Sequence, residues 1–217
     1  MTPLKVCCIS DLHGFLPIIP ECDICIIAGD VCPDSSIELQ LGWLNSMFRI
    51  WLESIKAKKI IGVFGNHDRI GEIPVLVPSL PWILLQDDFF EFENYKIYGM
   101  PWTLKYHGVF NLSEEEFQRK CGFIPEDIDI LISHSPPYKV GDYTKDGCSA
   151  GSKSLYERIV EVCPSIVVVG HLHESRGIYD MGCSFVINAS LRDVNYDPTN
   201  PPILIELKGK EVKILYK

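Results

Sequence analysis

The sequence predicts a mixed α/β domain, because two kinds of apolar segment alternate along its 217 residues. Short apolar runs have the length of buried strands, and several of them end abruptly in small or acidic residues. Between residues 37 and 55, apolar side chains instead recur every three or four positions, which indicates an amphipathic helix. Short strands separated by turn residues also cluster in the middle and at the end of the chain, which indicates hairpins.

In chain order, the predicted strands cover residues 4–10, 25–28, 59–64, 82–85, 89–92, 96–98, 129–133, 165–169, 184–187, 203–207 and 212–216. The predicted helices cover residues 37–55, 113–121 and 152–163. Ser113 and Glu116 have the spacing of a capping box, which marks the start of the second helix. The proline-rich segment 73–81 is expected to be irregular. Because no repeat, low-complexity tract or linker interrupts this order, we expect residues 1–217 to form a single domain.

The overall charge argues against a protein that grips long nucleic acids. The formal net charge is −9, whereas such proteins usually present a basic surface. An anionic small substrate is still compatible with this charge, because bound metal cations can reverse the sign of a local site. The hydrophobic content of 47% and charged content of 23% are typical of an ordinary globular protein.

The N-terminal residues and the cysteines lead us to expect a cytoplasmic protein without a membrane partner. The chain enters its first predicted strand without a secretory signal, and its apolar runs are shorter than the roughly 18–20 residues that span a bilayer. The nine cysteines are an odd number, and only Cys22 and Cys25 have CxxC spacing. We therefore expect reduced, mostly buried thiols rather than disulfides or a zinc site.

Polar side chains of unusual type follow five of the predicted strands directly. Five of the six histidines lie in these places, together with two carboxylates and a carboxamide: Asp11, His13, Asp30, Asn66, His67, His134, His171 and His173. In open α/β sheets, ligands bind at the carboxyl ends of the strands. A single Asp there is often a turn former, and a single buried His is often a hydrogen-bonded core residue. Neither explanation accounts for the whole series, because His has no turn preference.

Imidazole and carboxylate together suit divalent Mn, Fe, Co, Ni or Zn. Two such ions, about 3.5–4 Å apart, need a shared anionic ligand to offset their repulsion, and a carboxylate can bridge them. The sequence therefore indicates a site for one or two metal ions at the strand ends. Such a site would lower the pKa of a bound water and hold phosphate oxygens.

The ordered series D-L-H, G-D, G-N-H-D, H-S-P-P and G-H-L-H resembles the calcineurin-like metallophosphoesterase superfamily. Each motif alone is weak, but five in this order, covering roughly three-quarters of the chain, are highly specific. The resemblance implies a four-layer α/β/β/α sandwich of two mixed β-sheets flanked by helices. It also implies a two-metal site at the strand ends.

Carried over position by position, the resemblance implies two ligand sets that share one carboxylate. The ligands of one ion would be Asp11, His13, His173 and the bridging Asp30. The ligands of the other would be Asn66, His134, His171 and the same Asp30. His67 resembles the family's histidine that binds no metal but protonates the leaving oxygen and steadies the phosphate. Asp34 and Asp68 are both candidates to orient His67, and the sequence does not choose between them.

One departure from the wider superfamily narrows the substrate class. The branches that act on phosphoproteins and diadenosine polyphosphates carry GDxxDRG after the bridging aspartate, whereas residues 29–35 here read GDVCPDS. Segments at 99–103, 134–137, 146–148, 170–174 and 187–190 instead resemble metallophosphoesterase-domain proteins related to class III cyclic-nucleotide phosphodiesterases. Members of that branch hydrolyse phosphodiesters, some of them cyclic nucleotides.

The leading hypothesis is therefore hydrolysis of a small phosphodiester, of which a nucleotide is one candidate. The resemblance implies attack by a hydroxide that bridges two metals, with Asn66 steadying the phosphate charge and His67 acting as general acid. A phosphomonoesterase and a nuclease are alternatives that use the same site. A non-catalytic scaffold that binds protein partners is a further alternative, but such members usually lose a ligand or the histidine after Asn66, and this chain has lost neither.

Several points stay open at the level of sequence. The ion could be Mn²⁺, Fe²⁺ or Fe³⁺, Zn²⁺, Ni²⁺ or Co²⁺, because the mixed ligand set accepts them all. The physiological substrate and the oligomeric state, a homodimer included, are undetermined. Arg69 is either a phosphate contact or a solvated side chain, and His107 either lines the entrance or is an ordinary loop residue. Trp102 either stacks on a base or fills the core, and Asn188 is a candidate to support the ligands from behind.

Overall fold

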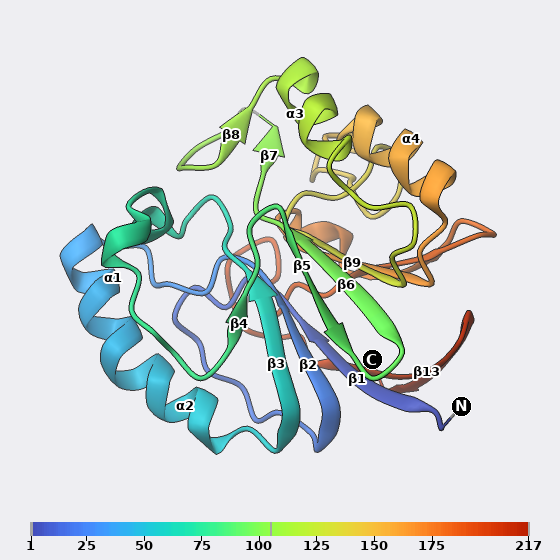
Figure 1. Ribbon diagram of the computed structural model, residues 1–217. Helices are drawn as coiled ribbons and strands as arrows, with labels where there is room; N and C mark the ends of the chain where they lie inside the picture. The colour runs from blue at the N-terminus through green and yellow to red at the C-terminus, as the bar shows by residue number, and fades with distance from the viewer. Residues whose placement is uncertain (1, 105, 217) are drawn as a thin grey trace.

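Two mixed six-stranded β-sheets form the centre of the computed structural model, which describes residues 2–104 and 106–216 (Figure 1). The strand order in the first sheet is β14 (Glu211–Tyr216), β13 (Ile203–Lys208), β1 (Leu4–Ile9), β2 (Cys22–Ala28), β3 (Ala57–Val63) and β4 (Ile83–Leu84). The order in the second sheet is β11 (Gly177–Asp180), β12 (Phe185–Asn188), β10 (Ile166–Val169), β9 (Ile130–Ser133), β6 (Tyr95–Met100) and β5 (Asp88–Phe92).

Each sheet combines a parallel centre with antiparallel edges. Strands β1 to β4 are parallel, and so are β6, β9, β10 and β12. The antiparallel strands β13 and β14 extend the first sheet, whereas β5 and β11 lie at the edges of the second. The carboxyl ends of the parallel strands therefore lie at one edge of each sheet, where the sequence places its polar residues.

The apolar faces of the two sheets pack against each other. Ile26 and Ile61 of the first sheet belong to the same fully buried cluster as Ile132 and Val168 of the second. These side chains alternate along their strands with others that face outward, as a two-residue period requires. The inner core thus holds the two sheets in register and brings their carboxyl ends together.

Helices cover both outer faces, which confirms the four-layer α/β/β/α sandwich (Figure 1). The first sheet is covered by α1 (Ile37–Trp43), a π-helical turn (Leu44–Phe48) and α2 (Arg49–Ser54). The second is covered by α3 (Glu114–Cys121) and α4 (Lys153–Val162). The capping box predicted at Ser113 and Glu116 is present. None of the helices among the described residues combines the length and hydropathy needed to cross a bilayer.

Some elements differ from the prediction. The segment expected to be one α-helix contains the π-helical turn, in which Asn45 and Ser46 donate side-chain hydrogen bonds to carbonyls one turn earlier. The strands β7 (Thr103–Leu104), β8 (Asn111–Leu112) and β11 were not predicted, because they are short and carry little apolar alternation. Strand β2 begins before residue 25, since Cys22 already pairs with Ala57 of β3.

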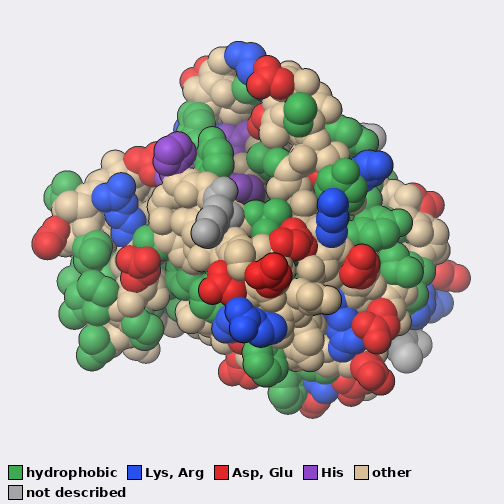
Figure 2. Space-filling view, turned by 90° about the horizontal axis from the view of Figure 1, so that it is seen from above, with side chains coloured by type: hydrophobic (Ala, Val, Ile, Leu, Met, Phe, Trp, Pro, Cys, Tyr) green, Lys and Arg blue, Asp and Glu red, His purple; other side chains and the backbone are tan. Residues whose placement is uncertain are grey.

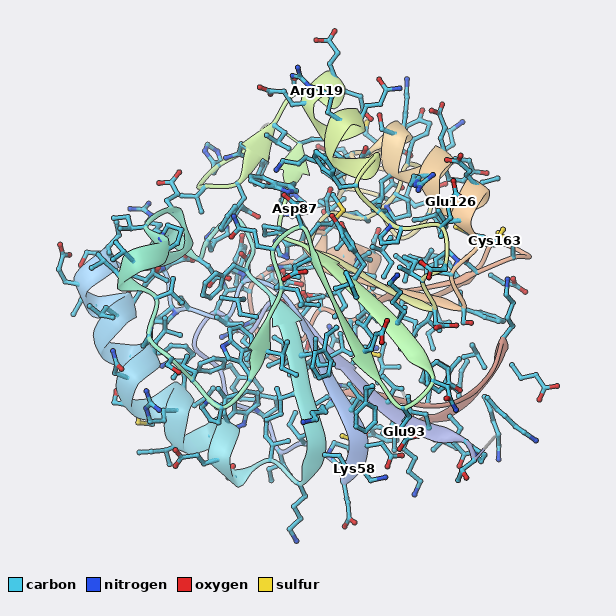
Figure 3. The ribbon with its side chains drawn as sticks, viewed as in Figure 1. Lys58, Asp87, Glu93, Arg119, Glu126 and Cys163 are labelled. Atoms are coloured by element: carbon cyan, nitrogen blue, oxygen red, sulfur yellow. The ribbon has the colours of Figure 1, made fainter. Side chains whose placement is uncertain are left out.

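At the opposite end of the sheets, a lysine faces two carboxylates, and no candidate metal ligand lies there among the described residues. Lys58 of β3 lies 2.7 Å from a carboxylate oxygen of Asp23 in β2 and 3.8 Å from one of Glu93, in the β5–β6 turn. Figure 3 shows Lys58 and Glu93 at the lower end of the sheets, away from the carboxyl ends of the parallel strands. This exposed pair links the two sheets, but such pairs add little stability.

Candidate metal centre

The ends of β1, β2, β3, β9 and β10 bring all seven predicted ligands to one place. His173 Nε2 lies 3.4 Å from Asp11 Oδ1, and His13 Nε2 lies 3.7 Å from Asp30 Oδ2. His134 Nε2 lies 3.2 Å from the same Asp30 oxygen. Potential ligand atoms cluster within 4.8 Å in overlapping groups, two of which are Asp11 with His13 and His173, and Asp11 with Asp30 and His134.

The backbone turns sharply at four of these residues. Asp11, His13, Asp30 and His171 have φ angles of 55°, 42°, 52° and 69°, in the left-handed region that non-glycine residues rarely adopt. Such conformations cost about 1–3 kcal/mol each and cluster at functional sites.

Close packing between the sheets requires glycine at position 170. A Cβ atom there would overlap Ser10 Oγ and Asp11 Oδ2, so only glycine allows the β10 end to lie against the β1 end. The His171 backbone N–H, one residue on, donates to both carboxylate oxygens of Asp11, at 3.0 and 3.1 Å. The two sheets are therefore joined at the site by a hydrogen bond to a candidate ligand.

The buried carboxylates are ionised. Burial alone would raise the pKa of Asp11 and Asp30, but the facing imidazoles of His173 and His134 hold both pKa values below the ordinary range. The same pairing overcomes burial at His134 and raises its pKa to about 9, chiefly through the charge of Asp30. Burial, aided by the charge of His134, lowers the pKa of His171 to about 3. The site is thus an anionic cluster partly neutralised by protonated imidazole, which suits cations.

Two imidazoles donate through Nδ1 to backbone carbonyls and present Nε2 to the other candidate ligands. His134 Nδ1 donates to the Ala28 carbonyl at 2.7 Å, and His173 Nδ1 donates to the Asp193 carbonyl at 3.2 Å. These bonds orient each Nε2 toward a carboxylate. His13 has neither ring nitrogen hydrogen bonded among the described residues, although both are buried. Because an unsatisfied buried imidazole is costly, its environment fits a metal ligand better than a structural histidine.

The structure also decides which aspartate orients His67. His67 Nδ1 forms a hydrogen bond with Asp34 Oδ1, so Asp34 fixes the ring and leaves Nε2 free. Asp68 instead accepts the backbone N–H groups of Gly65, Val31 and Cys32, at 2.8 to 3.2 Å. Asp68 therefore ties the turn after β3 to the turn after β2, which positions Asn66 and Asp30.

Asn66 presents its carboxamide oxygen to the site. Its Nδ2 donates to the His107 carbonyl at 2.8 Å, and its Oδ1 lies 3.1 Å from His134 Nε2. His107 thus supports the site through its backbone, while its side chain is exposed, as is that of Arg69. Trp102 packs in the helix layers, and its Nε1 donates to Asp87 Oδ1 at 2.7 Å. These contacts favour a role in the core over stacking on a nucleotide base.

Asn188, considered in the sequence as a support, has that role in the structure. Its Nδ2 donates to the Leu172 carbonyl at 2.9 Å, between the candidate ligands His171 and His173. Arg192, Asp193, Tyr106 and Tyr196 also contact candidate ligands, and sequence reasoning missed all four. They lie in loops without a recognisable motif, and the only available signal was their closeness to the segment 187–190 or to residue 107.

A cleft of about 430 Å³ opens beside the cluster. Of the cluster, Asp30, His67, His171 and His173 line this cleft. Its walls are Leu104, Tyr106, Thr144, Lys145, Asp146, Ala150, Leu172, Glu174, Val194 and Tyr196. Figure 2, which looks down on the carboxyl ends of the strands, shows histidine side chains gathered at one place and partly covered by others. The site is therefore accessible to a small molecule.

We predict that Gly170→Ala weakens metal binding at least tenfold, because the added methyl displaces Asp11. Equilibrium dialysis with Mn²⁺ would measure this. Gly42→Ala is the matched control, since a Cβ at this helical position meets no atom within 4 Å. Equal Mn²⁺ affinity of the Gly170→Ala variant and the unmodified protein would contradict the assignment of this strand end to the metal centre.

Metal binding should release a proton at pH 7. His134 has a pKa of about 9 in the metal-free protein and donates through Nδ1, so Nε2 must lose its proton before it can bind a cation. Affinity should therefore rise between pH 6 and 8, by up to about tenfold per pH unit for one proton. Titration calorimetry in two buffers with different ionisation enthalpies measures the proton count. Affinity that does not change over this pH range would contradict the prediction.

Comparison with known proteins agrees with the geometry. Residues 4–175 match the calcineurin-like phosphoesterase family. The human and mouse proteins called metallophosphoesterase domain-containing protein 1 are 32% identical over 235 residues, covering 92% of this chain and 70% of each relative.

Solved structures show the same fold. One superposes with a TM-score of 0.69 at 14% identity, over 98% of both chains. The 5′-nucleotidase precursor from Thermus thermophilus superposes with a TM-score of 0.56 at 12% identity, over 99% of this chain and 53% of that one. With its five strand-end motifs brought together around buried carboxylates, the chain belongs to the calcineurin-like phosphoesterase family, in the branch that includes metallophosphoesterase domain-containing protein 1.

Proposed function

We propose that the protein is a two-metal hydrolase of small phosphodiesters. Asp11, His13 and His173 would hold one divalent ion, and Asn66, His134 and His171 would hold the other. Asp30, whose carboxylate faces both His13 and His134, would contact both ions. When bound, such a pair of ions supplies a Lewis acid for the phosphoryl oxygens and activates a water for attack.

The hydrogen bond between His67 and Asp34 is the observation that carries the proposal. This pair of side chains is partly exposed, with 21% of His67 and 57% of Asp34 accessible to solvent. His67 also lines the cleft, and its backbone N–H donates to Asp30 Oδ1 at 2.8 Å. An oriented imidazole at the mouth of the site, with Nε2 free, can donate a proton to a departing alkoxide. A structural histidine would not need that exposure.

The charges of the cleft favour a diester over a monoester. Among the described residues that line it, Lys145 is the one lysine or arginine, whereas three are carboxylates, Asp30, Asp146 and Glu174. A diester carries one negative charge at neutral pH, whereas a monoester carries nearly two, so the diester needs fewer cations from the protein. Tyr106 and Val194 in the walls offer apolar contacts for the organic groups of a diester, and a nucleoside is one candidate.

We further propose that residues 1–217 act as one domain in the cytoplasm. The alternation of elements into one shared inner core supports the first point. The nine free cysteines, six of them buried, support the second, because disulfides are usual in secreted proteins of comparable cysteine content.

Three substitutions should separate metal binding from proton transfer. Asp30→Ala should abolish turnover of bis-p-nitrophenyl phosphate with Mn²⁺ and lower the number of bound ions, because Asp30 faces ligands of both sites. His67→Ala should retain both ions and lose about 10²–10⁴-fold in kcat for diesters with alkyl leaving groups, and less for acidic phenols that need no proton. The kcat of Asp34→Ala for the same diesters should lie between those of His67→Ala and the unmodified protein.

Steady-state kinetics and elemental analysis on the same samples provide both readouts. A panel of a monoester, a linear diester, and 2′,3′- and 3′,5′-cyclic nucleotides serves as the substrate control. Near-full turnover by Asp30→Ala would contradict the metal assignment. A clear preference for the monoester would contradict the diester assignment and leave the family intact.

A further inference from the structure

The loop after β12 is built against one half of the metal centre. We call residues 191–197 the strap. Its first residue is tied to the end of β1, since the Leu191 N–H donates to the Ser10 carbonyl at 2.9 Å. Within it, Asp193 Oδ1 accepts the backbone N–H groups of Asn195 and Asp197, at 2.8 and 3.0 Å. The strap therefore has a defined shape.

Arg192 of the strap binds the backbone of the segment that carries the candidate ligands Asp11 and His13. Its Nε and Nη2 donate to the Leu12 carbonyl, at 3.2 and 2.8 Å, and Nη2 also lies 3.2 Å from the His13 carbonyl. Its Nη1 donates to the Tyr196 carbonyl at 2.7 Å, which closes the strap on itself. One guanidinium thus joins three backbone carbonyls across two segments that are 180 residues apart.

These bonds act on a strained part of the backbone. His13 has a φ of 42°, and the carbonyls that Arg192 binds belong to His13 and to the residue before it. A left-handed non-glycine residue persists only where its surroundings hold it in place. The His13 and Gly14 N–H groups donate to the Asp30 and Val31 carbonyls, at 2.9 and 3.1 Å. Arg192 adds a restraint on the carbonyl side of the turn, because its planar fork can bind several carbonyls at once.

The strap also holds the third ligand of the same set. The Asp193 carbonyl accepts the hydrogen bond from His173 Nδ1. The Tyr196 ring packs edge-on against the rings of His13 and His173, with centroids 5.1 and 4.6 Å apart. Asp11 lies on the same β1 end as His13, so all the ligands peculiar to one ion lie on segments that the strap contacts.

The ligands of the other ion are held differently. His134 is fixed by the Ala28 carbonyl, and Asn66 by the His107 carbonyl. Among residues 2–104 and 106–216, no hydrogen bond or ring contact joins the strap to Asn66, His134 or His171. Among the described residues, the strap therefore supports one half of the centre, whereas the His171 N–H, which donates to Asp11, joins the two halves.

We propose that Arg192 is a positioning residue for the ion held by Asp11, His13 and His173, and that its loss empties this site selectively. The inference rests on the proposed two-metal function. Without the guanidinium, the turn at His13 relaxes, and the His13 ring no longer meets the Asp11 carboxylate and the His173 ring. The Asn66–His134–His171 site keeps its own restraints and its ion.

The test compares Arg192→Met and Arg192→Lys with the control Arg158→Met. Arg158 also donates a guanidinium hydrogen bond to a backbone carbonyl, that of Ile124, but it lies on α4. Mn²⁺ is titrated by equilibrium dialysis, electron paramagnetic resonance distinguishes coupled from isolated Mn²⁺, and thermal melting in EDTA monitors folding. Arg192→Lys keeps a donor but lacks the planar fork.

The unmodified protein and Arg158→Met should bind two coupled ions. Arg192→Met should weaken one dissociation constant about 10–100-fold, leave the other within twofold, and show the signal of isolated Mn²⁺. For Arg192→Lys, the weakened dissociation constant should lie between those of Arg192→Met and the unmodified protein. Both Arg192 variants should melt in EDTA at a temperature no lower than that of Arg158→Met. Retention of both ions, equal loss of both, or earlier melting would overturn the inference. Failure of the unmodified protein to bind two ions would instead overturn the proposed function.

Discussion

The buried carboxylate of Asp30 is the constraint on which the site depends. It lies directly after β2 at the junction of the two sheets, where it faces His13 and His134 and accepts the His67 backbone N–H. A charge in this position is stable only if cations or protonated imidazoles surround it. The histidines at the ends of β1 and β9 therefore satisfy Asp30, and a bound cation would satisfy all three together.

The sequence predicted those elements and side-chain positions that a single local sequence pattern determines. Buried parallel strands read as apolar runs, and the capping box at Ser113 marked the start of α3. The convergence of Asp11, Asp30, Asn66 and His171 followed from their shared place after parallel strands. The four-layer arrangement came from resemblance, because periodicity does not say which faces pair.

Other features depend on tertiary contacts that leave no local pattern. The choice between Asp34 and Asp68 depends on which carboxylate accepts the backbone N–H groups of Gly65 and Val31. Asp68 accepts them, and Asp34 instead binds the His67 ring. The roles of Arg192 and Tyr196 depended on the return of the chain from β12 to the end of β1, about 180 residues away. Strands of two residues, such as β7 and β8, are fixed by their partners and not by their own composition.

The most direct measurement is anomalous diffraction from crystals grown with Mn²⁺, collected so that the manganese signal locates each ion. The account predicts two peaks about 3.5–4 Å apart, both within ligand distance of Asp30, one beside His13 and His173 and the other beside Asn66 and His134. An absence of peaks among these residues, or a single ion bound away from Asp30, would contradict it.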